Sequence, residues 1–344
     1  MAASTGIVGA SVIMLSLIAF PVMLKSGYKA ELGLGTIAAS GTLGILIPPS
    51  IMLVVLGNQL NVSVGTLFSA ALIPGLMLAG LYLGYIILYS TFFPTHAPAI
   101  AREHGPEKLS ELLILILKSF LPPAFLIFLV LGSIFFGWAT PTEASGIGAA
   151  GAMLLAWLNR RLNRKMLREV FTRCASTNAM VFFIFIGATV FSYVFRVLGG
   201  DDVVLDLLEA AGIDTAWEIL IFIMGLVFLM GFFLDWIEIS LIALPIFVPM
   251  LAGVDFSAHG IPDAASFLPW FAVLLAVNMQ TSFLTPPFGF TLFFLKGSVP
   301  PHIKMTQIYR GVVPFVLLQL LGLGLLLSFP DIALWLPTRS GFID

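Results

Sequence analysis

Long apolar segments separated by short polar connectors run through the whole chain, and this pattern predicts membrane-spanning helices. Segments of spanning or near-spanning length occur at 7–24, 34–56, 67–93, 112–137, 141–158, 174–198, 217–252, 267–295 and 311–336. A hydrocarbon core about 30 Å thick requires about 20 apolar residues in a crossing helix. The pattern therefore predicts an all-α polytopic membrane protein.

Two of these segments are interrupted in the middle by a Pro-Pro pair. Pro48-Pro49 interrupts 34–56, and Pro286-Pro287 interrupts 267–295. Proline lacks a backbone donor and clashes with the preceding turn, so a helix is not expected to run undisturbed through such a pair. In lipid, the freed backbone groups are tolerated only where protein or a wet cavity satisfies them. Two broken helices, one in each half of the chain, indicate an inverted-repeat transporter with its site at the breaks.

The segment 217–252 is long enough to cross a membrane twice, and it carries Asp235 and Glu238 near its middle. Ionisable groups at depth are costly unless they line a polar site. We therefore expect a re-entrant hairpin of two half-length helices, with its tip inside the membrane. Asp235 is also well placed to cap the second of these helices. The alternative is one long tilted span.

The distribution of basic residues supports the hairpin. If the basic run within 159–173 is cytoplasmic, and 217–252 enters and leaves on one side, most of the 16 Lys and Arg residues fall inside. The residues placed inside are Arg160, Arg161, Arg164, Lys165, Arg168, Arg173, Lys25, Lys29, Arg102, Lys108, Lys296, Lys304 and Arg310. The outside connectors 57–66, 199–216 and 253–266 contain no Lys or Arg. The 159–173 connector also has one apolar face, which predicts an interfacial helix on the inner leaflet.

Composition and motifs restrict the function. The chain is 59% hydrophobic and 10% charged, and it has no basic patch of the kind that binds nucleic acid. No nucleophile elbow, phosphate loop or zinc-ligand motif is present, so we expect neither an enzyme nor a cofactor. Thr140-Pro141-Thr142-Glu143 fits a helix capping box. Cys174, the one cysteine, is interpreted as a small buried side chain.

Small and oxygen-bearing residues cluster around the two breaks. Unwound carbonyls together with Ser, Thr and Asn oxygens suit a hard cation such as sodium, and half-helix N-termini suit a carboxylate. The candidate sodium ligands are Ser40, Gly41, Thr42, Asp235, Asn278, Thr281, Thr285 and Gly289. The candidate substrate contacts are Pro48, Pro49, Ser50, Ser282, Pro286 and Pro287. The alternative for the breaks is a pair of kinked helices that pack through small residues.

We expect three parts in the chain. Residues 1–93 form a first repeat with the end of a hairpin and the first broken helix, 94–173 form connecting spans and the basic interfacial helix, and 174–344 form the second repeat with hairpin 217–252 and broken helix 267–295. Asp235 precedes Pro286 by 51 residues, and the same spacing before Pro48 falls near or before Met1. We therefore expect the first repeat to be incomplete, with 2–6 beginning the returning limb of its hairpin.

Four stretches resemble the large, DctM-like membrane subunit of tripartite ATP-independent periplasmic (TRAP) transporters. They are Gly41-Thr42-Leu43-Gly44-Ile45-Leu46-Ile47-Pro48-Pro49-Ser50, Ala139-Thr140-Pro141-Thr142-Glu143-Ala144, Phe233-Leu234-Asp235 and Leu284-Thr285-Pro286-Pro287-Phe288-Gly289. The match runs from about residue 3 to residue 336. Asp235-Trp236-Ile237-Glu238 and residues 280–287 resemble the mannitol/chloroaromatic branch, some members of which handle 2-oxo acids.

The resemblance implies an elevator-type, sodium-driven importer in the bacterial inner membrane. It implies two partners, a small DctQ-like membrane subunit and a soluble periplasmic protein that delivers a carboxylate. Two alternatives have the same apolar pattern. One is a stand-alone sodium- or proton-coupled carboxylate transporter, and the other is a truncated membrane remnant that does not transport.

Overall fold

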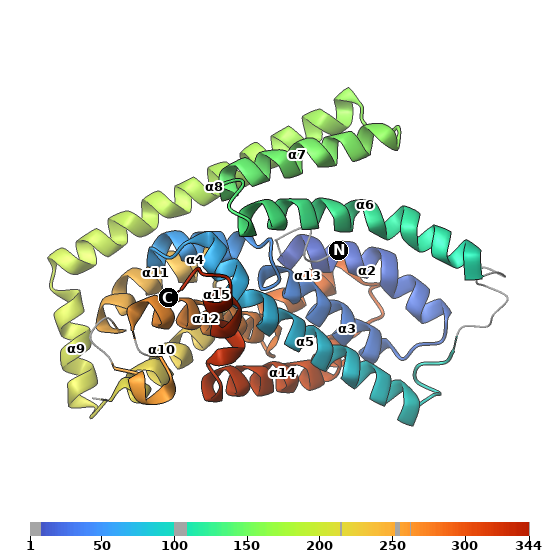
Figure 1. Ribbon diagram of the computed structural model, residues 1–344. Coiled ribbons are helices and arrows are strands. Elements are labelled where there is room, and N and C mark those ends of the chain that lie inside the picture. Colours follow the sequence, from blue (N-terminus) through green and yellow to red (C-terminus); the bar gives the residue numbers. More distant parts are fainter. Residues whose placement is uncertain (1–7, 100–108, 214, 252–254, 262, 344) are drawn as a thin grey trace. The chain divides into compact units, whose positions relative to one another are not determined.

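The described part of the chain consists of helices joined by connectors (Figure 1). The computed structural model describes residues 8–99, 109–213, 215–251, 255–261 and 263–343. Within these ranges the only strand-like pairing is the isolated bridge between Phe256 and Ile261. Two compact units are present, one built from residues 1–98 and 184–344 and the other from 99–183. The prediction of an all-α protein is confirmed, whereas the division into two repeats stays a prediction.

Five helices in the described ranges are long and apolar enough to cross a membrane. They are α2 (Val8–Lys25), α5 (Val64–Phe92), α8 (Arg164–Val197), α12 (Ala264–Leu284) and α14 (Met305–Ser328). A sixth candidate is α6 (Leu109–Phe135), which bends by 42° after Lys118. Pro122 and Pro123 explain this bend, because neither can donate to the carbonyl four residues before it. The chain is a multi-pass membrane protein.

The first predicted break is present. Helix α3 (Ala30–Thr42) ends in the short 3₁₀ turn η1 (Leu43–Ile45), and α4 (Ile51–Leu60) begins after the Pro-Pro pair. The peptide bond Pro48–Pro49 is cis. Helix α4 has only 10 residues and covers about 15 Å, so it cannot cross a membrane alone.

The second break and the hairpin are also present. Helix α12 stops at Leu284, and α13 (Phe290–Ser298) begins after Pro286-Pro287, whose peptide bond is cis as well. Residues 217–252 form α10 (Ala216–Met230) and α11 (Trp236–Leu251), which pack against each other. The two helices have 15 and 16 residues and each covers about 23 Å. The prediction of two half-length helices is therefore confirmed, and the alternative of one long span is wrong.

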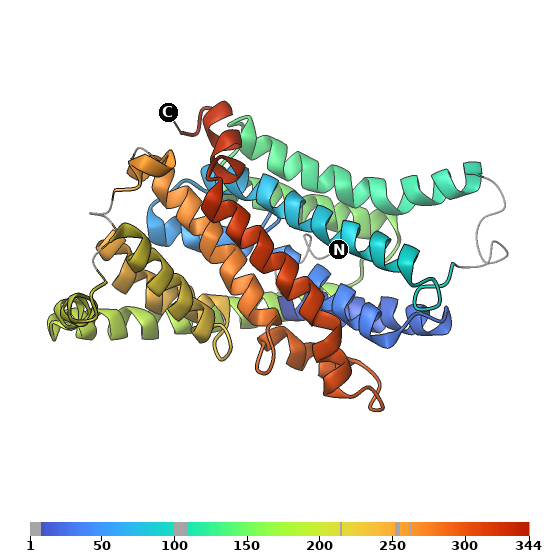
Figure 2. The same cartoon turned by 90° about the horizontal axis from the view of Figure 1, so that it is seen from below.

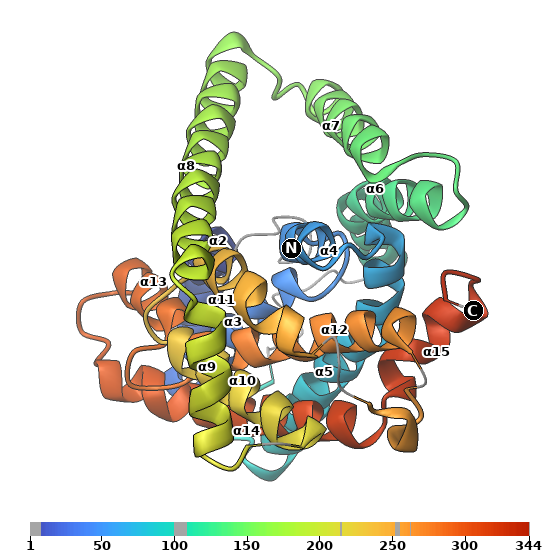
Figure 3. The same cartoon turned by 90° about the vertical axis from the view of Figure 1, so that its left-hand side faces the viewer.

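Helix α12 forms the centre of the first unit (Figure 3). It packs against α3, η1, α4, α5, α10, α13, α14 and α15 (Asp331–Arg339). Helices α12 and α14 lie side by side (Figure 2). All side chains of α12 from Phe267 to Leu284 are buried except Leu268. A helix that is buried all round belongs to the protein core, so the second break lies at the end of the most enclosed helix.

Helices from the two halves of the chain pack against each other in a reciprocal pattern. Helix α2 contacts α13, the second limb of the second broken helix, and α11 contacts α4, the second limb of the first. Ser16 of α2 donates to Ser298 of α13 at 2.6 Å, and a methyl group on Gly9 would lie 3.0 Å from the Phe294 ring. Each limb that precedes one broken helix thus packs on the end of the other broken helix.

Other sequence predictions need correction. The separate interfacial helix at 159–173 is wrong in its C-terminal part, because Arg164–Val197 is one continuous helix with no proline and no glycine before Gly187. Cys174 on this helix is exposed rather than buried. The segment 311–336 divides after Ser328 into α14 and α15, where Pro330 follows. Residues 2–6 lie outside the described ranges.

The second unit contains α6, α7 (Pro141–Leu158) and the first part of α8. The predicted capping box at the start of α7 is confirmed. The Thr140 hydroxyl accepts from the Glu143 amide, and the Glu143 carboxylate accepts from the Thr140 amide at 2.8 Å. A further helix, α9 (Gly200–Ala210), lies in the first unit within a stretch interpreted from the sequence only as a connector.

Candidate functional site: the two broken helices and the hairpin tip

The elements that carry the two breaks pack against each other. Helix α12 contacts α3, η1 and α4, and α13 contacts α3. The residues of both breaks therefore lie in one region of the first unit rather than on separate faces. That the two breaks form a common site stays a prediction.

At the first break, Ser50 replaces the hydrogen bond that proline removes. Pro48 and Pro49 are the residues that would donate to the Ile45 carbonyl in a 3₁₀ or α-helix, and neither has an amide hydrogen. The Ser50 hydroxyl donates to this carbonyl at 2.5 Å, and its oxygen accepts from the Leu53 amide at 3.4 Å as the N-cap of α4. Ser50 thus satisfies the carbonyl that the Pro-Pro pair leaves without a helical donor.

At the second break, the corresponding carbonyl has no such partner. Phe283 precedes Pro286-Pro287 by the spacing at which Ile45 precedes Pro48-Pro49, so its carbonyl loses both helical donors. The residue in the place of Ser50 is Phe288, whose side chain cannot donate. No hydrogen bond to the Phe283 carbonyl occurs in the described part of the chain. A buried carbonyl without a donor is costly in lipid, and a bound cation would satisfy it.

Gly289 lies directly beside this carbonyl. A methyl group on residue 289 would be 2.5 Å from the Phe283 carbonyl oxygen and 2.9 Å from that of Thr285. The Gly289 amide donates to the Thr285 carbonyl at 3.0 Å, and Gly289 is the N-cap of α13. Glycine therefore allows two carbonyl oxygens and the N-terminus of α13 to approach closely.

The tip of the hairpin lies against the second break. Gly231, where α10 ends, touches the Ser282 side chain so closely that a methyl group on Gly231 would overlap the Ser282 hydroxyl. The rings of Phe233 and Phe288 have centroids 5.4 Å apart. Four residues before Ser282 on α12, the side-chain amide of Asn278 donates to the backbone carbonyl of Met224 on α10 at 2.7 Å. The tip is thus held next to the end of α12.

Four hydroxyl groups among the predicted sodium ligands and substrate contacts donate to backbone carbonyls of their own segment. Thr42 donates to Ala39, Thr281 to Val277, Ser282 to Met279 and Thr285 to Thr281, at 2.7–2.9 Å. A hydroxyl that donates in this way keeps oxygen lone pairs for a cation. The local bonds therefore agree with a role as helix-stabilising groups, and they leave a role as ion ligands open.

The remaining predicted residues lie in the same elements. Ser40, Gly41 and Thr42 form the end of α3, and a methyl group on Gly41 would meet Val12 of α2. Pro48 is buried and Pro49 is half-buried in the first break, whereas Pro286 is half-buried and Pro287 is exposed in the second. The Pro287 carbonyl accepts from the Tyr309 hydroxyl at 2.9 Å.

Asp235 and Glu238 lie at the start of α11 and differ in their hydrogen bonds. Asp235 directly precedes the helix, as predicted, and its carboxylate accepts from the Trp236 amide at 2.8 Å. The Oε2 atom of Glu238, one turn later, is buried and has no hydrogen-bond partner. A buried carboxylate oxygen in this state requires a proton or a cation. Sequence reasoning had noticed Glu238 but assigned the ligand role to Asp235.

Several buried polar atoms near the breaks belong to residues outside the predicted set of ligands. The Thr291 hydroxyl, in the first turn of α13, is buried without a partner. Gln280 donates to the Tyr82 hydroxyl at 3.2 Å, while its own carbonyl oxygen is buried without a partner. Gln319 of α14 is fully buried. The one signal for these positions in the sequence is a polar residue within an otherwise apolar segment.

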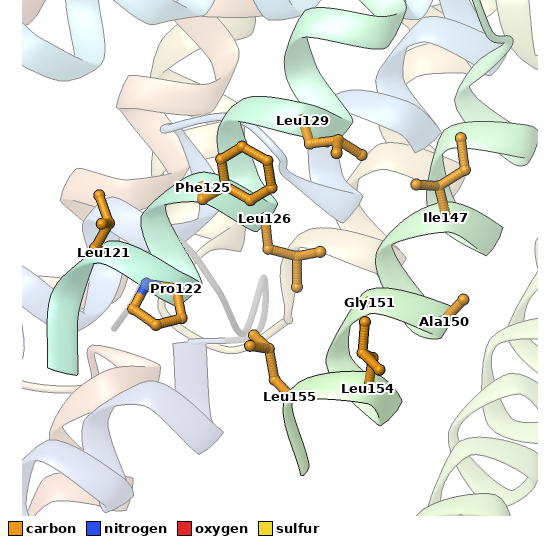
Figure 4. Close-up of a pocket in the computed structure, with 10 residues that line it drawn as sticks. All are labelled: Leu121, Pro122, Phe125, Leu126, Leu129, Ile147, Ala150, Gly151, Leu154 and Leu155. Carbon is orange, nitrogen blue, oxygen red and sulfur yellow. The ribbon is translucent and has the colours of Figure 1, made fainter. Parts of the chain in front are cut away.

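A large groove in the second unit does not compete as an ion site. It has a volume of about 690 Å³ and lies between α6 and α7 (Figure 4). Its walls are aliphatic and aromatic side chains such as Leu121, Phe125, Ile147 and Leu154. Such a lining offers no oxygen to a cation.

Comparison with known proteins finds relatives along nearly the whole chain. Residues 1–332 match the family model of the tripartite ATP-independent periplasmic transporter, DctM component. The chain is 30% identical over 343 residues to the C4-dicarboxylate TRAP transporter large permease protein DctM of Pseudomonas aeruginosa, covering 99% of this chain and 75% of that protein. It is 29% identical over 320 residues to the sialic acid TRAP transporter large permease protein SiaM of Vibrio cholerae, covering 92% and 69%.

A third relative is named for a different solute, isethionate. It is the isethionate TRAP transporter permease protein DctMQ of Oleidesulfovibrio alaskensis, 28% identical over 339 residues, which cover 97% of this chain and 50% of that protein. All three relatives are transport proteins rather than enzymes. The chain belongs to the DctM family, the large permease subunits of TRAP transporters.

Proposed function

We propose that this chain is the membrane-spanning permease of a sodium-coupled importer of small carboxylates. Sodium binds at the two broken helices and the hairpin tip, and the carboxylate binds between them. The observation that carries the proposal is the second break, where the Phe283 carbonyl has lost both helical donors beside the hairpin tip. The unpartnered oxygen of Glu238 at that tip supports a cation nearby, because both groups are acceptors that a cation would satisfy.

The proposal includes an inverted repeat and an elevator movement. Support comes from the reciprocal packing of α2 on α13 and of α11 on α4, since a pseudo-two-fold axis would exchange these two contacts. In this scheme the broken helices and hairpins carry the solute across as one body. A crosslink between the hairpin and a helix outside this moving body would stop uptake if the movement occurs. It would leave uptake unchanged if transport needs no such movement.

The membrane potential sets the minimum number of sodium ions. Bringing one negative charge into an inside-negative cell costs about 2.3 kcal/mol per 100 mV, and each entering sodium ion returns a similar amount. Two sodium ions per monovalent carboxylate would therefore make uptake favourable and electrogenic, and a dicarboxylate would need three for the same net charge. Neither break has a convincing Lys or Arg of its own to neutralise the solute, which makes sodium the counter-charge.

The family implies two partners, and we include them in the proposal. A small DctQ-like membrane subunit would complete the membrane complex, and a periplasmic binding protein would deliver the solute. The location would be the bacterial inner membrane. For the substrate, Asp235-Trp236-Ile237-Glu238 and residues 280–287 favour 2-oxo acids, while two of the relatives carry C4-dicarboxylate and sialic acid in their names.

Uptake into proteoliposomes tests the proposal. The large subunit, the small subunit and the binding protein are reconstituted together, and uptake of pyruvate, succinate and sialic acid is measured with a sodium gradient, a proton gradient or neither. We expect uptake of one of these acids only with the sodium gradient. Uptake that ignores sodium would refute the coupling. Uptake without the binding protein would favour the stand-alone carboxylate transporter.

A further inference from the structure

An apolar groove lies between α6 and α7 in the second unit (Figure 4). Its cavity of about 690 Å³ shares Phe125, Leu129 and Ile147 with a neighbouring cavity of about 420 Å³, so the two form one groove. On α6 the lining extends over 12 residues from Leu121 to Ser133, which corresponds to about 18 Å of helix. One leaflet provides about 15 Å of hydrocarbon, half of the bilayer core. The groove is therefore long enough for an acyl chain.

The walls of this groove are almost entirely hydrocarbon. Among the described lining residues, those of the larger cavity are all apolar, and Ser133 and Trp138 bear the polar side-chain atoms of the smaller one. The Ser133 hydroxyl already donates to the Val130 carbonyl at 2.8 Å. The rings of Phe125 and Phe128 are largely exposed. Because large exposed apolar patches mark sites of protein or membrane contact, the part of a ligand that enters this groove is apolar.

Contacts across the groove fix the alignment of α6 and α7. A methyl group on Gly151 would lie 2.3 Å from Cδ1 of Leu126, and one on Gly148 would lie 3.1 Å from Cγ2 of Val130. Moving back along α7 thus corresponds to moving forward along α6, so the two helices are antiparallel. The end of the groove at Leu121 therefore lies beside the last turn of α7.

Basic residues gather at this end of the groove. The connector after α7 turns back on the helix, since the Arg160 amide donates to the Trp157 carbonyl at 2.9 Å and the Arg161 amide donates to the Ala156 carbonyl at 2.8 Å. Both arginines therefore stay beside the last turn of α7. On α6, the exposed side chain of Lys118 lies about one turn before the groove begins. Both helices of the groove thus carry positive charge at the same end.

The charges of these three basic residues are not neutralised within the described part of the chain. Their side chains make no hydrogen bond or ion pair with any residue there. The acidic residues near them in sequence are few. Segment 159–173 contains six basic residues and one acidic residue, Glu169. On α6, Glu111 lies about two helical turns before Lys118. The end of the groove is therefore a region of net positive charge.

The groove and its basic end match the two parts of an anionic phospholipid. An acyl chain suits the apolar walls, and guanidinium groups bind phosphate through paired hydrogen bonds. Basic pockets beside membrane helices on the cytoplasmic side bind anionic headgroups, and the basic residues of 159–173 predict that side for this end of the groove. A neutral lipid or an apolar helix of a partner would fill the groove but leave the cations without a counter-charge. The charge therefore favours an anionic lipid.

We propose that the groove between α6 and α7 binds an acyl chain of an anionic glycerophospholipid, whose phosphate is held by Arg160 and Arg161 with Lys118 beside it. The site lies within one unit and does not depend on the identity of the transported solute. It can therefore be tested by lipid binding alone, without a transport assay.

Lipid competition tests the headgroup. The purified complex with its small subunit is mixed with equal amounts of palmitoyl-oleoyl phosphatidylglycerol and phosphatidylcholine, and the bound lipids are counted by native mass spectrometry. Each basic residue beside an anionic lipid strengthens binding about fivefold, so R160Q/R161Q should lower the preference for phosphatidylglycerol about 25-fold. R160K/R161K keeps both charges and should keep most of the preference. A preference that R160Q/R161Q leaves unchanged would overturn the headgroup assignment.

A variant of equal charge separates a site from general attraction. R168Q/R173Q removes two exposed arginines from α8, further along the chain than the turn after α7. It has the same net charge as R160Q/R161Q and should keep most of the preference for phosphatidylglycerol. If both double variants lose the preference equally, the lipid is attracted by the whole basic surface, and the site is overturned.

Two further measurements test the groove. Ala150 is exposed in the lining, so A150W should fill the groove and lower the number of bound phosphatidylglycerol molecules. Ala149 is exposed outside the described lining, so A149W should not. In the wild type, dihexanoyl phosphatidylglycerol has the same headgroup but short chains, and it should displace the long-chain lipid poorly. Equal displacement by the two lipids would overturn the role of the groove. If A150W releases the small subunit in gel filtration and leaves lipid binding unchanged, the groove belongs to that subunit and the lipid proposal is wrong.

Discussion

Gly289→Ala perturbs the proposed ion site through one added methyl group. The backbone of Gly289 has φ of −40°, a value that alanine also adopts, so the substitution acts through space rather than through backbone strain. The new methyl group would be 2.5 Å from the Phe283 carbonyl oxygen, and real contacts of this kind are essentially never below 3.0 Å. The carbonyl and the start of α13 must therefore separate by at least 0.5 Å, the difference between these two distances.

A shift of this size is large for an ion ligand. Metal–ligand distances are reproduced to about 0.2 Å in functional sites, so the Phe283 carbonyl would leave the coordination shell. We expect the sodium concentration for half-maximal uptake to rise about tenfold to a hundredfold, the range found when support of a metal ligand is lost. Overpacking should also lower the free energy of unfolding by about 1–3 kcal/mol.

The matched control is Gly297→Ala on the same helix. Gly297 has open space around its missing side chain, so alanine there should leave transport unchanged and slightly favour the helix. Thermal unfolding of the detergent-solubilised protein is measured with sodium and with potassium, because a bound ion raises the midpoint with its concentration. If G289A keeps the same sodium-dependent shift as G297A, the Phe283 carbonyl is not a ligand.

The other predictions concern the hairpin tip, its carboxylate and the first break. Gly231→Ala should block uptake by pushing the tip off α12, whereas Gly225→Ala, in open space on the same helix, should not; equal activity of the two would contradict tip docking. Glu238→Gln should raise the sodium requirement of uptake about tenfold or more, and an unchanged sodium titration would remove Glu238 from the site. Ser50→Ala should lower the free energy of unfolding by about 2–4 kcal/mol, combining a lost cap and an orphaned carbonyl. Ser63→Ala, which removes the cap on α5 and a hydroxyl–hydroxyl bond to Thr66 but leaves no carbonyl without a donor, should cost about 1 kcal/mol, and equal losses would contradict the second role of Ser50.

Local chemistry explains why some site residues could be predicted. The Pro-Pro pairs, the hydroxyl residues before them and the position of Asp235 directly before α11 follow from backbone donors and short-range hydrogen bonds, which the sequence states directly. Glu238 and Phe283 were harder to assign. A carbonyl or a carboxylate oxygen is recognised as unpartnered only when every neighbouring donor is known, and those neighbours come from distant segments.

The three Pro-Pro pairs also show that a local sequence pattern does not decide the structure alone. Pro122-Pro123 bends α6 by 42° without ending the helix, while Pro48-Pro49 and Pro286-Pro287 each end one. All three pairs remove two amide donors. They differ in what surrounds them, since α12 packs against eight other elements, and a neighbour such as Ser50 or Tyr309 can satisfy carbonyls outside a helix.

The sequence by itself determined the membrane class, the positions of both breaks and the hairpin 217–252, because apolar length and proline chemistry act within a single segment. Only the tertiary structure decided that α12 is the central helix, that the hairpin tip rests on Ser282, and that Arg196 meets Pro245. In an apolar chain almost any helix face can pack against any other. The choice among those packings depends on small residues and freed carbonyls matching across segments as far apart as residues 196 and 245, and no local pattern records such a match.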